Sequence, residues 1–408
     1  TLLQSSAASD VYKRQLIMDK KYEIILYGGT GFTGQLCAKY FKENYPDLNW
    51  AIAGRNKDKL EETKEKFALK TDILVADGDN LEALRVLAGQ TKVVLSTAGP
   101  FARYSDLLVQ ACVEQGTHYT DITGENHWVR TLIDKHHDNA SLKGVRIVPS
   151  CGYDSIPSDI GALYTVSQFN KPVKRINLYQ EMQGGASGGT IETGFTMGKL
   201  SKEMRDPFLL NPENSVTDEQ RNNSKDEIKI EKIEELDAWS GMFVMAAANT
   251  RVVRRSAALM EQNQKSYGTN FTFGEYGLHK TKKLARRASY GLVLGFLIIA
   301  SPLKGIVRRF LPKPGEGPSE DVQNNGWFRS TFIAEAEDGE RKICSIYGSG
   351  DPGYKSTSKL VCESALTLAR SVNLPGGDDY GGVLTSAAGL GEELINRLKE
   401  ADIDFKVH

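Results

Sequence analysis

The chain has 408 residues, enough for about two or three domains with cores of their own. Its 51 Lys and Arg residues nearly balance its 52 Asp and Glu residues, so the net charge is −1. This balance argues against a protein coated in positive charge for nucleic acid, and against a disordered acidic chain. The five cysteines include no Cys-x-x-Cys pair, and the six histidines include no His-Glu-x-x-His motif. We therefore expect a reducing, cytoplasmic compartment, no nucleic-acid partner and no metal site.

The N-terminal segment, residues 1–17, differs in character from the rest of the chain. It is rich in serine and lacks the apolar run of a secretory signal. We interpret it as a non-native or disordered leader and expect the natural start at Met18. A mitochondrial presequence is the less favoured alternative.

A glycine-rich turn follows the first predicted strand. An apolar, β-prone run over residues 22–27 leads into this turn and then into residues with helical spacing. Strand, glycine turn and helix in this order are typical of dinucleotide binding, because the backbone can approach a pyrophosphate at the helix N-terminus. We predict that the turn holds the cofactor phosphates through Gly28, Gly29, Thr30, Gly31, Phe32, Thr33 and Gly34.

Residues at the ends of the next strands extend this site. A second strand is predicted over residues 50–53, and Arg55 follows it where an NAD enzyme would carry an acid for the ribose. An arginine suits the 2′-phosphate of NADP instead. Further strands are predicted over residues 72–77 and 92–100. The cofactor predicted is therefore NADP(H), with Arg55, Asn56 and Asp77 on the adenosine side and Thr97, Ala98, Gly99 and Pro100 beneath the nicotinamide.

The alternation of strands and helices continues to the end of the first domain. Strands are predicted over residues 117–122 and 145–149, with helices over residues 106–115 and 126–140. This order predicts an α/β fold with a Rossmann-type, doubly wound parallel sheet over residues 18–157.

After Pro157 the pattern changes. A long alternating strand starts at Pro172, and a second glycine-rich loop runs from Gly184 to Thr190. A hairpin is expected around Asp338-Gly339. We predict a second, α+β domain over residues 158–355, and a segment over residues 356–408 whose helices return to pack on the sheets.

Several short segments, taken together and in order, carry a family resemblance. They are residues 27–34, 53–56, 98–104, 119–125, 151–159, 187–190, 350–354 and 381–385. In these segments the chain resembles the saccharopine dehydrogenase-like oxidoreductases, in particular the branch that holds trans-acting enoyl reductases. The resemblance implies an NADP-binding sheet followed by an α+β domain, and it links the chain to lipid metabolism, glycolipid assembly and lipid surfaces.

Hydride chemistry needs few protein groups, since the cofactor supplies the hydride and the chain must orient the acceptor and manage one proton. Candidates should lie at the carboxyl ends of strands. Tyr104 follows the fourth strand, Asp121 and Glu125 follow the fifth, and Tyr153 and Asp154 follow the sixth. For each, packing, a turn or a helix cap is the alternative role. We name Tyr153, Asp154 and Tyr104 as the catalytic candidates.

The predicted reaction is the NADPH-dependent reduction of a conjugated double bond in a lipid or lipid-linked substrate. Two alternatives stay open. One is a non-catalytic, NADP-binding protein of lipid surfaces, or scaffold. The other is an imine reductase of the saccharopine type, although the sequence shows no basic clamp for two dicarboxylate ends. A homodimer is also left open.

A basic segment is concealed by the near-neutral total. Residues 276–315 hold nine Lys and Arg residues and no acid, and they flank an apolar run from Ala288 to Leu303. This run is shorter than the ~20 residues that cross a bilayer, and Pro302 would end the helix. It is either a buried helix with basic ends or an element that dips into a lipid surface. We favour the second, with segment 280–313 holding the chain peripherally on a lipid droplet or an inner membrane face.

Overall fold

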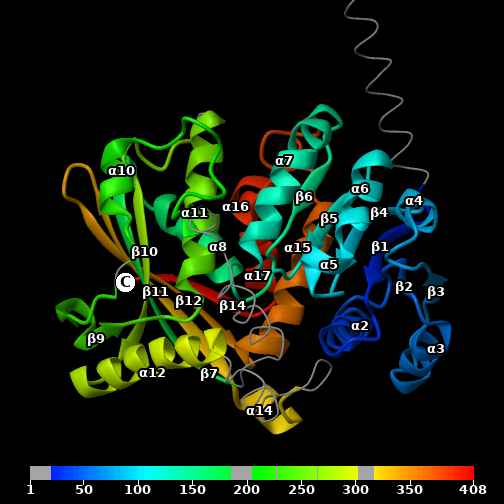
Figure 1. The fold of residues 1–408 in the computed structure, drawn as a ribbon, viewed down its shortest axis with the longest axis horizontal. Coiled ribbons are helices and arrows are strands. Elements are labelled where there is room, and N and C mark those ends of the chain that lie inside the picture. The colour runs from blue at the N-terminus through cyan, green and yellow to red at the C-terminus, as the bar shows by residue number, and fades with distance from the viewer. Residues whose placement is uncertain (1–19, 185–204, 227, 264, 302–316) are drawn as a thin grey trace, which may run out of the picture.

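The computed structural model describes residues 20–184, 205–226, 228–263, 265–301 and 317–408. Two layered bodies, each built on a sheet, lie side by side in Figure 1. The predicted leader, the glycine-rich loop after Gly184 and residues 302–313 of the basic segment lie outside the described residues.

The first sheet has seven strands in the order β13-β6-β5-β4-β1-β2-β3, and every neighbouring pair is parallel. The order reverses between β1 and β4, and ligands of such sheets bind at the carboxyl ends of the strands around this point. The strands are β1 (Tyr22–Tyr27), β2 (Trp50–Gly54), β3 (Asp72–Val75), β4 (Thr91–Ser96), β5 (His118–Asp121), β6 (Arg146–Val148) and β13 (Gly382–Val383).

Helices cover both faces of this sheet, because alternate residues of its central strands are apolar on both sides. Ile24 and Leu26 of β1 belong to the core beneath α2 and α15, whereas Ile25 and Tyr27 belong to the core beneath α4 and α6. The helices are α2 (Phe32–Asn44), α3 (Lys57–Lys66), α4 (Leu81–Gly89), α5 (Phe101–Tyr104), α6 (Asp106–Glu114), α7 (Asn126–Leu142) and α15 (Thr357–Arg370).

The second sheet is mixed, with the order β14-β12-β11-β7-β10-β9-β8. β7 and β10 are parallel and the other neighbours are antiparallel. The predicted hairpin joins β11 to β12, and Gly339 takes a left-handed φ of 90° in its turn. The strands are β7 (Val173–Gln183), β8 (Lys232–Ile233), β9 (Ala238–Gly241), β10 (Thr272–His279), β11 (Trp327–Ala336), β12 (Arg341–Ser349) and β14 (Ile403–Val407).

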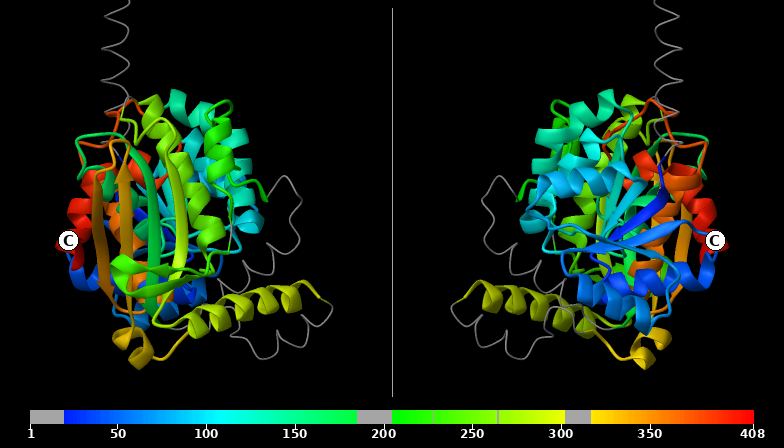
Figure 2. Two further views of the ribbon diagram at one scale, coloured as in Figure 1. Left: turned by 90° about the vertical axis from the view of Figure 1, so that its left-hand side faces the viewer. Right: turned by 90° about the vertical axis from the view of Figure 1, so that its right-hand side faces the viewer.

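One face of the second sheet packs against helices that also reach the first sheet. A Cβ at Gly161 would overlap the ring of Phe332, so glycine lets α8 lie directly on β11. The left view of Figure 2 looks onto the opposite face. The remaining elements are α8 (Ile156–Val166), α10 (Asp218–Asn223), η2 (Glu234–Leu236), α11 (Ala246–Gln262), α12 (Lys282–Ala300), α14 (Glu320–Asn325), η3 (Pro352–Ser356), α16 (Ser386–Gly389) and α17 (Gly391–Glu400).

This architecture confirms the predicted fold class, a parallel Rossmann-type sheet with a second α+β sheet and returning C-terminal helices. The C-terminal segment differs in one respect from the helices expected there. It also supplies an edge strand to each sheet, β13 to the first and β14 to the second. Two-residue β13 is too short to show the alternation that identifies strands in a sequence.

The helix α12 contradicts the alternative of a buried apolar helix. Tyr290 is 64% exposed, Leu294 58% and Leu297 63%. Among the side chains described in α12, Ala285 and Ser289 alone are buried. None of the helices in the described ranges combines the length and the apolar character needed to cross a bilayer.

Candidate active site

The glycine turn is locked onto the end of β4. The amide of Thr97 donates to the carbonyl of Tyr27 over 2.9 Å, and its hydroxyl donates to the carbonyl of Gly28 over 3.1 Å. Gly28 has a left-handed φ of 89°, and a Cβ there would come within 2.9 Å of the Ala98 nitrogen. The turn therefore needs glycine both for its conformation and for its contact with β4.

The start of α2 is suited to phosphate. A Cβ at Gly34 would overlap the carbonyl oxygen of Gly28, so the helix can begin this close to β1 only with glycine there. Gly31 precedes the helix without a side chain to cap it, and the first turn of α2, all of which is described, holds no acid. The amide groups and partial positive charge of the helix start are thus available to an anion. These residues fit the pyrophosphate of a dinucleotide.

The predicted adenosine-side residues gather around Tyr27 at the end of β1. The pKa of the Tyr27 phenol is raised to about 12, chiefly by burial and then by the charge of Asp77, while the charge of Arg55 lowers it. Arg55 is exposed directly after β2. Asn56 accepts the amide of Lys59 over 3.0 Å and caps α3. The structure therefore places Arg55 and Asp77 near the same phenol, that of Tyr27. The side-chain oxygen of Asn56 caps α3.

Two acids at the end of β5 hold the backbone in place. Asp121 accepts hydrogen bonds from the amides of Thr123 and Ser150 and from the hydroxyl of Tyr119, each over 2.9 Å. Glu125 accepts the amides of Phe101 over 2.9 Å and Ala102 over 3.2 Å, at the start of α5. The contacts of both acids are therefore structural, as expected if they hold turns and helix starts rather than a substrate. Asp121 positions the segment that leads to Tyr153.

The three catalytic candidates divide into two places in the described structure. Tyr104 ends α5, and its carbonyl lies beside Gly78 in the turn after β3. Tyr153 and Asp154 follow β6, which lies two strands away from β4, the strand that precedes α5. A role for Tyr104 stays a prediction, and the group that can work together is Tyr153 with Asp154.

Tyr153 lies between the two sheets. Its ring meets Phe328 of β11 edge-on at 5.0 Å, and its amide donates to the hydroxyl of Thr357 over 3.1 Å. Its own hydroxyl is buried and has no hydrogen-bond partner among the described residues. Burial, and then the charges of Glu275 and Asp154, raise the pKa of Tyr153 well above its usual value. This phenol keeps its proton at neutral pH and is a weak acid, able to protonate only a strongly basic atom.

Asp154 has an unusual carboxyl group. It is partly exposed, and burial of the rest raises its pKa from 3.8 to about 6. A carboxyl that titrates near neutral pH can take up a proton from solvent and give it up again.

A contact between distant parts of the chain was not visible in the sequence. Phe32 of the glycine turn meets Tyr354 of η3 edge-on at 4.6 Å. The Gly350–Tyr354 motif therefore covers the start of α2. In the sequence, the Gly350–Tyr354 motif was identified only as one of the segments that resemble the family. No local residue pattern shows which turn it covers.

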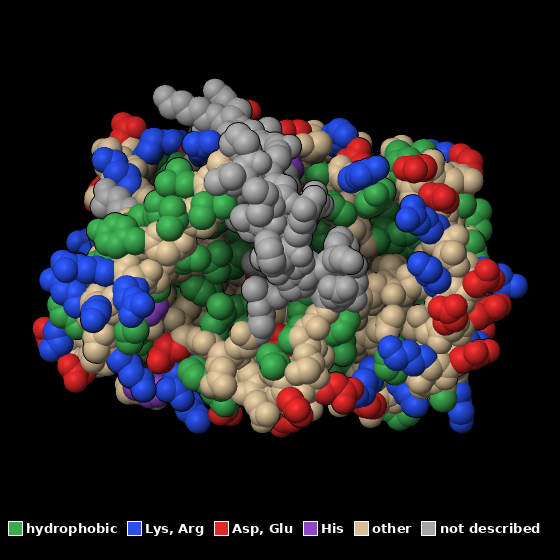
Figure 3. All heavy atoms as spheres, turned by 60° about the horizontal axis from the view of Figure 1, so that its bottom comes forward, with side chains coloured by type: hydrophobic (Ala, Val, Ile, Leu, Met, Phe, Trp, Pro, Cys, Tyr) green, Lys and Arg blue, Asp and Glu red, His purple; other side chains and the backbone are tan. Residues whose placement is uncertain are grey.

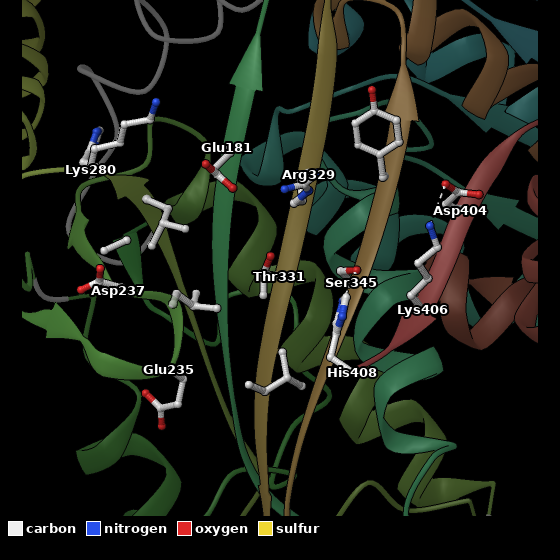
Figure 4. A pocket seen from close by; sticks show the side chains of 16 residues that line it. Glu181, Glu235, Asp237, Lys280, Arg329, Thr331, Ser345, Asp404, Lys406 and His408 are labelled. Carbon is white, nitrogen blue, oxygen red and sulfur yellow. Dashed lines mark hydrogen bonds and ion pairs between the residues drawn. The ribbon is translucent and has the colours of Figure 1, made fainter.

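A separate hollow of about 810 Å³ lies on the face of the second sheet that Figure 4 shows, with helices behind the strands. Its walls carry both acids and bases, among them Glu181, Arg329 and Lys406. None of the predicted cofactor or catalytic residues lines it. The hollow is therefore distinct from the site at the glycine turn.

Known proteins share both the sequence and the fold. Residues 24–148 match the saccharopine dehydrogenase NADP-binding domain. A Mycobacterium tuberculosis protein provisionally named a trans-acting enoyl reductase is 33% identical over 95% of this chain and 97% of its own length. The trans-acting enoyl reductase of Mycobacterium leprae is 32% identical over 94% and 97%, respectively.

The fold is shared with a solved structure of apo saccharopine dehydrogenase (L-Glu forming) from Saccharomyces cerevisiae. The two superpose with a TM-score of 0.53 over 95% of this chain and 100% of the yeast chain, at 13% identity. This likeness concerns the fold alone. The match to the family model shows that residues 24–148 form an NADP-binding domain.

Replacing Arg55 by Asp should change the cofactor preference, because the arginine offers a positive charge to a 2′-phosphate and an aspartate repels it. We expect tighter NAD and weaker NADP binding in isothermal titration. Lys57→Asp, at an exposed position of α3, is the charge-matched control. Unchanged NADP affinity in Arg55→Asp would contradict this role.

Replacing Asp154 by Asn should stabilise the chain more at pH 8 than at pH 4. The pKa of Asp154 is higher in the folded chain than in an unfolded one, so its contribution to stability is lost as the pH rises from about 4 to about 6. Asparagine does not ionise and avoids this loss. Thermal unfolding at both pH values measures the difference, with Asp138→Asn on the exposed side of α7 as the control. Equal effects of Asp154→Asn at both pH values would contradict the raised pKa.

Proposed function

We propose that this chain reduces a carbon–carbon double bond conjugated to a carbonyl in a lipid or lipid-linked substrate. The chain belongs to the saccharopine dehydrogenase-like family and matches its trans-acting enoyl reductases over almost its full length. The observation that carries the proposal is the presence, in one chain, of an NADP-binding domain and of Tyr153, a buried phenol after β6 whose hydroxyl has no hydrogen-bond partner among the described residues. The relatives are oxidoreductases of the enoyl reductase type.

The chain's own groups have three tasks in this reaction. The amides at the start of α2 hold the phosphates, and NADPH supplies the hydride when bound. The end of β4 supports the substrate side of the turn through Thr97. Tyr153 donates the proton to the carbon next to the one that accepts the hydride, and the packing of its ring on Phe328 holds its hydroxyl in place.

Removing the proton donors should slow turnover and spare cofactor binding. We expect Tyr153→Phe to lower kcat by about 100-fold, within the range that positioned acids contribute, and Asp154→Asn to lower it less. NADPH affinity should not change, because neither side chain belongs to the glycine turn. Stopped-flow absorbance of NADPH with a trans-2-enoyl thioester measures the rate.

Tyr164→Phe is the matched control, since Tyr164 lies at the other end of α8 and packs on Phe405. It should leave kcat unchanged. Normal turnover in both Tyr153→Phe and Asp154→Asn would refute the assignment of the proton donor.

A lipid substrate suggests a lipid surface, and α12 has the features of a docking element. Its exposed large apolar residues are Leu284, Tyr290, Leu294 and Leu297. Exposed cations lie at and just before its start, namely Lys280, Lys282, Lys283, Arg286 and Arg287. Figure 3 shows hydrophobic side chains beside Lys and Arg side chains on the side of the molecule that carries this helix.

These cations lie at the end of the helix where the helix dipole disfavours positive charge. Lys282 and Lys283 open α12, and its first turn holds no acid. Cations at a helix start oppose the helix dipole, each at a cost on the order of 0.5 kcal/mol. Anionic headgroups would offset this cost while the apolar side chains enter the boundary of the acyl chains. We propose that α12 holds the chain peripherally on an anionic lipid surface.

Substituting Tyr290, Leu294 and Leu297 by serine should weaken binding to vesicles of phosphatidylcholine and phosphatidylserine by about tenfold or more, because each apolar side chain loses its transfer energy. Vesicle flotation measures the bound fraction. The control substitutes Val86, Leu142 and Val372, which are as exposed but lie on other helices or turns. Equal binding of the two triple variants, or no wild-type binding at low salt, would contradict the docking role.

A further inference from the structure

A buried carboxyl group lies behind Tyr153. Glu275 of β10 is 5% exposed, on the face of the second sheet that packs against α8 and α11. Its Oε1 atom accepts three hydrogen bonds, from Ser158 Oγ over 3.0 Å, Gln180 Nε2 over 2.8 Å and Asn249 Nδ2 over 3.0 Å. These donors come from α8, β7 and α11, so three elements hold the carboxyl in one orientation.

The second oxygen of this carboxyl, Oε2, differs from Oε1 in its hydrogen bonding. Glu275 Oε2 is buried and has no hydrogen-bond partner among the described residues. The hydroxyl of Tyr153 is another such atom, and the charge of Glu275 contributes to raising the pKa of Tyr153. Buried polar atoms without partners are rare and point to a function. Here two of them belong to groups that influence each other electrostatically.

The surroundings of Glu275 favour its protonated form. The groups that hold its Oε1 atom are neutral, and the titratable groups coupled to it are Tyr153 and Asp154 from the turn before α8. Burial, opposed in part by the three hydrogen bonds, raises the pKa of Glu275 to about 7. With Oε1 engaged as an acceptor, Oε2 is the atom that carries the proton.

We propose that Glu275 is a positioning residue that replaces the proton which Tyr153 gives to the substrate. This role rests on the proposed enoyl reduction. Hydride addition to one carbon sends the π electrons of the double bond to its neighbour, which takes the proton as the O–H bond of Tyr153 breaks. The O–H bond of Glu275 then breaks, and its proton restores the phenol by way of a bridging water, since the two oxygens are not hydrogen-bonded to each other. Solvent reprotonates Glu275 through partly exposed Asp154, and the sum consumes one NADPH and one proton per double bond.

Glu275→Gln is the direct test, because it keeps an oxygen for the three donors and removes the titrating proton. We expect kcat with a trans-2-enoyl thioester to fall by about 10- to 100-fold, at the lower end of acid–base contributions, with NADPH affinity unchanged. The wild-type kcat should fall as the pH rises through about 7, and this dependence should be absent in the variant. If Glu275→Gln turned over at the wild-type rate and kept the wild-type pH dependence of kcat, the proposal would be overturned.

Ser158→Ala tests the same proton without removing it. Loss of one donor to the carboxylate raises the pKa of Glu275, so the fall in kcat should move to higher pH while the rate at low pH is kept. A purely structural role for Ser158 would lower the rate at all pH values without moving the profile, and that result would count against the proposal.

Infrared spectroscopy separates this inference from the proposed function. In the NADP-bound chain we expect a protonated carboxyl band that disappears near pH 7, is absent in Glu275→Gln and shifts its titration in Tyr153→Phe. Asp159→Asn is the matched control, because burial also raises the pKa of Asp159, to about 6, but both of its oxygens are hydrogen-bonded. Without enoyl reduction by the wild type, the proposed function fails. If no carboxyl band depends on both Glu275 and Tyr153, the proposed coupling of the two groups is refuted, even if the chain is an active enoyl reductase.

Discussion

The close packing of the glycine turn against the end of β4 is the constraint on which the rest of the site depends. Gly34 lets α2 start beside the carbonyl of Gly28, and Thr97 ties that carbonyl to β4. The helix start is thereby aimed at the crevice where the strand order reverses. Larger side chains at these positions would move α2 and, with it, the amides that face the phosphates.

The second constraint joins the two sheets. The backbone after β6 is held by Asp121, and Tyr153 at its end packs on Phe328 of β11. The three donors to Glu275 come from elements on both sides of this contact. The surroundings of Tyr153, the proposed proton donor, thus come from both halves of the chain, whereas the glycine turn needs the first half and the covering ring of Tyr354.

Local patterns were enough to predict the first six strands, the glycine turn and the fold class, because burial on both faces and the turn geometry leave clear residue patterns, whereas the edge strands β13 and β14 were missed. The adenosine-side residues were predicted from strand ends, and the charges of Arg55 and Asp77 both act on Tyr27 in the structure. The contacts of Asp121 and Glu125 could not be read from the sequence, since an acid after a strand looks the same whether it binds backbone amides or a substrate. Glu275 was missed for a related reason. It lies in an alternating strand, and its partners are Ser158, Gln180 and Asn249, far away along the chain.

The central claim is that the chain transfers a hydride from NADPH and a proton of its own to adjacent carbons of a conjugated double bond. Mass spectrometry of the product of a trans-2-enoyl thioester tests this most directly. The account predicts one deuterium from NADPH labelled at the transferred hydride, and one deuterium on the neighbouring carbon when unlabelled NADPH is used in D2O. If NADP stabilises the fold but no saturated product forms, the chain is a binding protein rather than a reductase, and the account is contradicted.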